Sequence, residues 1–132
     1  MEEILKKIGI SEKTLSQMEE MCPKIKELND EDVLQKIEIL KSINCNDVQI
    51  RNIISSNAMY LDRSNTDINK LINQLTELGF DNLDLIFDGN PYILNLDDFE
   101  VARYIKEREK KGELLEDIVD DMSSNLFIFE GI

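Results

Sequence analysis

The sequence predicts an all-α protein built as a solenoid of about three and a half helical repeats. A hexapeptide, Leu-x-x-apolar followed by Gly or Asn and a further apolar residue, begins at Leu5, Leu40 and Leu75, at steps of 35 residues. A fourth, degenerate copy starts at Gly112. No segment shows the sustained alternation that indicates a β-strand. Repetition at this period is typical of stacked units, each too small to bury its own apolar face.

Each repeat is expected to open with an amphipathic helix that ends at Gly or Asn. Its apolar residues recur at i, i+3, i+4 and i+7, and the Gly or Asn suits a left-handed residue that terminates a helix. The first copy keeps only residues 2–8. The later helices begin near Asn29 or Asp30, near Thr66 and near Asp97. Their expected buried residues are Val33, Leu34, Ile37, Leu40 and Ile43, then Ile68, Leu71, Ile72, Leu75 and Leu78, then Val101, Ala102 and Ile105.

A second, shorter helix follows each Gly or Asn. Ser11, Asn46 and Asp81 stand at the expected N-caps, where each is worth about 1 kcal/mol. The apolar residues expected to be buried are Leu15 and Met18, then Ile50, Ile53 and Ile54, then Leu83, Ile86 and Phe87, and finally Leu114, Leu115, Ile118 and Val119.

A short apolar turn completes each repeat. It begins at Pro23 and Pro91 in two repeats and spans residues 58–61 and 126–129 in the others. Proline is tolerated in a first helical turn, so a 3₁₀ turn is expected at each place. The chain then forms a single domain, residues 1–132, with repeats at about 1–28, 29–63, 64–96 and 97–132.

Two features mark the end of the array. Arg108 occupies the register position of Leu5, Leu40 and Leu75, so we expect it in a solvent-facing capping layer that tolerates substitution. Residues 126–129 are strongly apolar. They are expected either to close the last repeat against the core or to form an exposed peptide that docks into a partner.

These motifs resemble the repeat of the mitochondrial transcription termination factor (mTERF) family. That repeat has the pattern Leu-x-x-Leu-Gly-apolar and later Asn-Pro followed by Leu. The best match here runs from Leu75 to Leu94, and residues 40–61 are a second match in which Asn44 replaces Gly and Ala58 replaces Pro. The resemblance implies a left-handed superhelix of helix–helix–3₁₀ units. It also implies a nucleic-acid-binding regulator, since most members bind nucleic acid along a basic concave surface.

The charge of the chain departs from that family pattern. The 15 basic and 28 acidic residues give a net charge of −13, which repels a phosphate backbone and attracts basic partners. Residues 1–79 hold 10 basic and 14 acidic side chains, whereas residues 80–132 hold 5 and 14. The basic residues of the N-terminal half are scattered: Lys6, Lys7, Lys24, Lys26, Lys41, Arg51 and Arg63.

No pattern for catalysis, metal or cofactor binding is present in the sequence. There is no histidine, and Cys22 and Cys45 are isolated, so no zinc site can be assembled. Both cysteines are expected to be free buried thiols. The glycines do not form a phosphate-binding loop. We therefore expect no cofactor, no metal and no enzymatic activity.

Carboxylates at helical spacing are the candidate binding residues. Asp81, Asp84 and Asp88 share one face of a short helix, and Glu113, Glu116 and three aspartates form a similar stripe on the next. The residues selected as the partner-binding site are Asp84, Asp88, Asp117, Asp120 and Asp121. Such an array would bind a basic protein surface, or imitate a nucleic-acid backbone. The alternative is an mTERF-like nucleic-acid-binding regulator that uses the less acidic N-terminal half.

The N-terminal residues and the hydropathy of the chain bear on its expected location. The N-terminus is acidic where a secretory signal needs basic residues. No apolar run is long enough to span a bilayer. A cytoplasmic protein with no membrane partner is expected, and the oligomeric state is left open.

Overall fold

The computed structural model describes residues 1–124, and all of their regular elements are helices. The chain divides into two compact units, Met1–Asn65 and Thr66–Ile132. The predicted closing turn at residues 126–129 lies outside the described part of the chain.

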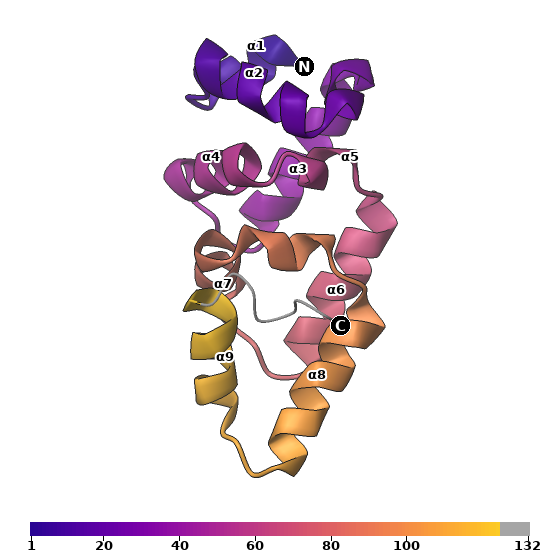
Figure 1. Cartoon of the computed structure of the whole chain (residues 1–132), viewed down its shortest axis with the longest axis vertical. Helices are drawn as coiled ribbons and strands as arrows, with labels where there is room; N and C mark the ends of the chain where they lie inside the picture. Colours follow the sequence, from indigo (N-terminus) through magenta and orange to yellow (C-terminus); the bar gives the residue numbers. More distant parts are fainter. Residues whose placement is uncertain (125–132) are drawn as a thin grey trace. The chain divides into compact units, whose positions relative to one another are not determined.

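Unit 1 contains two successive repeats whose equivalent elements pack on each other. The first has α1 (Glu2–Lys7), α2 (Glu12–Met21) and the 3₁₀ turn η1 (Pro23–Glu27). The second has α3 (Asp30–Ser42), α4 (Asp47–Ser56) and α5 (Met59–Asp62). α1 packs on α3, α2 on α4, and η1 on α5, as Figure 1 shows for these segments. The predicted helical repeat is therefore confirmed, although the turn of the second repeat is α-helical rather than 3₁₀.

Unit 2 continues the same order of elements. It has α6 (Asn65–Glu77), which starts at the last residue of unit 1, then α7 (Leu83–Gly89) and the 3₁₀ turn η2 (Pro91–Asn95). The next repeat has α8 (Asp98–Lys110) and α9 (Leu115–Ser124). α9 packs along α7, its counterpart in the preceding repeat (Figure 1).

The Gly and Asn columns end the helices as predicted. Gly9, Gly79 and Gly112 have φ angles of 98°, 101° and 89°, and Asn44 has 71°. The next residue donates its N–H to the carbonyl of the repeated leucine at 3.1 Å, from Ile10 to Leu5, from Cys45 to Leu40 and from Phe80 to Leu75. This reversal turns the chain from the long helix into the short one.

The repeated leucine is fully buried in both units. Leu5, Leu40 and Leu75 are 0% exposed, and so are Val33, Ile68 and Val101 at a second equivalent position of the repeats. Two predicted core residues are wrong, because Leu34 and Leu114 are 48% and 61% exposed. Five others are only half-buried: Ile43, Ile72, Leu78, Leu115 and Val119. The buried face of α3 follows Val33, Ile37 and Leu40, and Leu34 is rotated about 100° from Val33. Leu114 precedes the first turn of α9.

Side-chain caps start α2, α3, α4 and α8. Ser11 accepts a hydrogen bond from the Thr14 N–H, Asn29 and Asn46 form capping boxes, and Asp97 caps α8. The predicted cap at Asp81 is wrong. The first bond of α7 runs from Ile86 N to Asn82 O, so Asn82 is the N-cap, and it makes no side-chain cap bond.

Candidate nucleic-acid interface

The two units differ strongly in charge. Unit 1 has 9 basic and 12 acidic side chains, a net charge of −3, whereas residues 66–132 have 6 and 16, a net charge of −10. A phosphate backbone approaching unit 1 therefore meets much weaker repulsion. This makes the cations of unit 1 the first candidates for an interface.

Several of these cations already have a partner. Lys6 pairs with Glu12 at 3.0 Å, Lys26 with Glu19 at 3.9 Å and Lys41 with Glu38 at 3.8 Å. At least one side chain of each pair is largely exposed, so the lysine could readily exchange its carboxylate partner for a phosphate.

Lys36 is buried in the core of unit 1 and unsuited to binding a ligand. Its ammonium donates to Asn65 Oδ1 at 2.6 Å, and burial lowers the pKa of this lysine. The Tyr60 hydroxyl donates to the Lys36 carbonyl at 2.6 Å, and burial raises the pKa of that tyrosine. These bonds link α3 to α5 and to Asn65 at the end of unit 1.

Arg51 lies against the Gly9 turn. A side chain built at Gly9 would place its Cβ 3.1 Å from Arg51 Cδ and 3.2 Å from Nη1, so the absence of a side chain lets the arginine approach. Arg51 comes from α4, whereas Gly9 joins α1 to α2. Among residues 1–124, no carboxylate pairs with its half-exposed guanidinium.

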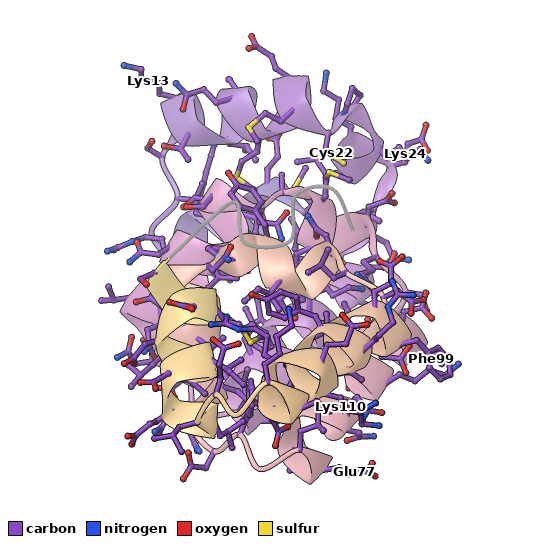
Figure 2. The ribbon with its side chains drawn as sticks, turned by 60° about the horizontal axis from the view of Figure 1, so that its bottom comes forward. Lys13, Cys22, Lys24, Glu77, Phe99 and Lys110 are labelled. Atoms are coloured by element: carbon purple, nitrogen blue, oxygen red, sulfur yellow. The ribbon has the colours of Figure 1, made fainter. Side chains whose placement is uncertain are left out.

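Three lysines flank the same turn along the chain. Lys6 and Lys7 form the end of α1, and Lys13 lies in the first turn of α2. Figure 2 shows Lys13, and Lys24 of η1, pointing away from the ribbon. We call Lys6, Lys7, Lys13 and Arg51 the Gly9 corner. Lys6, Lys7 and Arg51 are among the scattered basic residues noted from the sequence, whereas Lys13 is not, because no repeated position marks it.

The predicted acidic site residues lie on the neighbouring helices α7 and α9 of unit 2. Asp84 and Asp88 on α7 are half-buried, whereas Asp117 and Asp120 on α9 are exposed. Asp121 is engaged in an ion pair with Arg108. The carboxylates selected from the sequence therefore do not share one environment.

A groove of about 280 Å³ runs between α9 and the segment that leads into α7. Asp120 lies on this groove together with Asp81 and Glu116. Its apolar lining comes from four side chains: Phe80, Ile86, Leu115 and Val119.

The expectation that Arg108 faces solvent as a replaceable cap is wrong. Its side chain is only 15% exposed. The guanidinium donates to both carboxylate oxygens of Glu113, to Asp121 and to the Tyr104 hydroxyl. The inward register position of the repeated leucine explains this burial, and the three partners compensate the buried charge. The ion pair raises the pKa of Arg108 and lowers that of Glu113.

Neither a metal centre nor a membrane span is found in the described part of the chain. Residues 1–124 contain no group of three His, Cys, Asp or Glu side chains arranged to hold a metal ion. Within the same residues, no helix has both the length and the apolarity needed to cross a bilayer. Cys22 and Cys45 are buried and are not joined by a disulfide.

Comparison with known proteins gives one family. The model of the family described as mTERF matches residues 2–105, which include all the elements of unit 1 and those of unit 2 as far as the middle of α8. No curated protein and no solved structure matches the chain.

Proposed function

We propose that this chain, which belongs to the mTERF family, is a non-enzymatic nucleic-acid-binding regulator that contacts the phosphate backbone through unit 1. The observation that supports the proposal is the Gly9 corner. There, the Arg51 guanidinium, which has no carboxylate partner among residues 1–124, lies against a turn that is flanked by lysines.

The geometry of the corner suits a phosphate group. Arginine presents several N–H donors in a rigid fork that matches phosphate oxygens, and lysines add mobile positive charge around it. Because Arg51 is half-exposed and held against a glycine, its side chain loses less freedom on binding than a fully extended one. The contact would be to the backbone and therefore independent of sequence.

Because the Gly9 corner offers only four cations to phosphates, we expect weak binding that depends on salt. Four cations correspond to a slope of about −3 to −4 when log K for duplex DNA is plotted against log salt concentration. The acidic unit 2 would further weaken binding to nucleic acid at low salt. The proposal therefore predicts Kd values in the range of about 1–100 µM near physiological salt, which is typical of non-specific binding.

A second candidate function is docking of a basic protein on unit 2. It is favoured by the groove between α7 and α9, which combines an apolar lining with the carboxylates Asp81, Glu116 and Asp120. In this proposal Asp84, Asp88, Asp117 and Asp121 would add to the attraction of a basic surface, and salt would weaken it.

One pair of titrations separates the two functions. The double variant Asp117→Asn, Asp120→Asn removes two exposed charges and should leave the helical circular dichroism unchanged. A nucleic-acid binder should then hold duplex DNA or RNA more tightly in a gel-shift titration, because repulsion falls. A basic-protein receptor should instead lose capture of lysine-rich peptides. No binding of either polynucleotide by the wild type at physiological salt would reject the first function.

A further inference from the structure

Three cations and an exposed phenylalanine lie in line along α8. Phe99, Arg103, Lys106 and Lys110 are separated by four, three and four residues, so they fall within about 60° around the helix axis and span about 16 Å. All four are exposed, and Phe99 is 78% exposed. Figure 2 shows Phe99 and Lys110 standing out toward opposite ends of this helix. We call these four residues the α8 stripe.

The cations of the stripe form no ion pair within the described residues. The ion pairs of α8 in residues 1–124 involve Arg108, which lies on the opposite, inward face. Arg103, Lys106 and Lys110 have no carboxylate within ion-pair distance there. Half of the six basic residues in positions 66–132 are thus gathered on one narrow face of an otherwise acidic unit.

We propose that the α8 stripe binds single-stranded nucleic acid. Phe99 stacks on one unpaired base, and the three cations contact phosphates of the adjoining nucleotides. This inference rests on the proposed nucleic-acid-binding function and adds the class of ligand. An isolated exposed phenylalanine would need no explanation. Its position at the end of a line of cations gives the combination of stacking platform and charged track that single strands require.

The flanks of the stripe argue against a duplex on this face. Glu100 and Glu107 lie about 80–100° to one side, and Asp98 and Glu109 lie as far to the other. A helix inserted in a major groove has phosphates along both of its sides, so both flanks would be repelled. A single strand that follows the stripe contacts the cations and stays farther from the carboxylates of both flanks.

The accessibility of the base faces also favours a single strand. In a duplex the base faces are covered by their neighbours, so Phe99 could only touch base edges or sugars. In a single strand a base can leave the stack and place its face on the ring. A base–aromatic stack tolerates any base, so little sequence preference is expected from Phe99.

The test uses the full chain and fluorescence anisotropy with two probes. One is a labelled mixed-sequence 12-nucleotide single strand, and the other is the blunt duplex of the same sequence. Phe99→Ala removes the ring, and Phe99→Tyr keeps it. Leu85→Ala is the matched control, because Leu85 is also an exposed apolar residue of unit 2, at 58%. Circular dichroism verifies that each variant keeps its helix content.

We expect Phe99→Ala to raise the Kd for the single strand at least about fivefold, whereas Phe99→Tyr and Leu85→Ala change it less than about twofold. The duplex Kd should not change. Neutralising Arg103, Lys106 and Lys110 to Gln should reduce the salt slope for the single strand by about 2, and Lys70→Gln on α6 should not reduce it by more than about 1.

Two results would overturn the inference while leaving nucleic-acid binding by unit 1 intact. One is that Phe99→Ala binds the single strand as tightly as the wild type does. The other is that Phe99→Ala loses as much affinity for the duplex as for the single strand. Stronger binding of the wild type to vesicles with anionic lipid than to the single strand, abolished by Phe99→Ala, would assign the stripe to a membrane surface instead. Absence of binding to both nucleic-acid probes would reject the proposed function itself.

Discussion

The guanidinium of Arg108 holds Glu113 by two hydrogen bonds, from Nε to Oε2 at 2.9 Å and from Nη2 to Oε1 at 2.5 Å. The same side chain donates to the Tyr104 hydroxyl at 2.8 Å and reaches Asp121 on α9. One arginine thus links α8, the turn after Gly112 and α9.

Arg108→Ala should therefore lower the free energy of unfolding by about 1–2 kcal/mol, because several charge-assisted bonds and the packing of the side-chain stem are lost. Urea denaturation measures this loss, and a change below about 0.3 kcal/mol would show that the network contributes nothing.

The Arg108–Glu113 pair also makes stability depend on pH. The folded-state pKa of Glu113 lies below its usual value of 4.5, because Arg108 stabilises the carboxylate. The stabilisation is therefore complete above about pH 4.5 and disappears as the pH falls through the lowered value. The difference in unfolding free energy between wild type and Glu113→Gln should be constant from pH 6 to 8 and should shrink below pH 4.5. In an Arg108→Ala background, Glu113→Gln should make no such difference.

Gly89 is expected to be the glycine least tolerant of a side chain. A Cβ at this position would lie 2.1 Å from the carbonyl oxygen of Ser123, so an alanine would push α9 away from α7. We expect Gly89→Ala to cost more than about 2 kcal/mol. Gly112→Ala is the control, since its Cβ would meet nothing within 4 Å and only the strain of positive φ, about 1 kcal/mol, applies. Equal losses in chemical denaturation would show that α9 does not approach α7 this closely.

Asn44 offers a stabilising substitution. Its φ of 71° is costly for most side chains but not for glycine, which the equivalent positions Gly9 and Gly79 already carry. Asn44→Gly should therefore leave the melting temperature unchanged or raise it. Asn44→Val should lower it, because a β-branched side chain is strained at positive φ. A marked loss of stability in the glycine variant would mean that the Asn44 side chain has a role beyond its backbone conformation.

The repeat could be predicted from the sequence because its signals depend on residues close together in the chain. A left-handed residue after a periodic helix needs Gly or Asn, and Gly79 and Asn44 have the predicted positive φ. The buried leucine column followed from the same register. Gly89 had no such local signal, because its requirement comes from the backbone of α9 more than thirty residues later in the chain.

The charged residues were harder to place than the core. A charged residue in the last repeat predicts solvent exposure for Arg108, whereas its three partners Glu113, Asp121 and Tyr104 allow it to be largely buried. The Gly9 corner needs Arg51 from the next repeat, and only packing of α2 on α4 brings that arginine to the turn. The α8 stripe, in contrast, is visible in the sequence itself, because its residues are spaced by four, three and four within one helix.

The central claim, that unit 1 binds nucleic acid at the Gly9 corner, is tested most directly by a matched charge-removal titration. Fluorescence anisotropy with a mixed-sequence duplex compares the wild type with two double variants. The corner variant carries Lys7→Gln and Arg51→Gln. The control variant carries Lys26→Gln and Lys41→Gln, which remove the same charge elsewhere in unit 1. We predict saturable wild-type binding, a corner variant weakened at least about fivefold with a salt slope lower by about 2, and a control changed by less than about twofold. Equal weakening of both variants, or no wild-type binding up to about 100 µM, would contradict the account.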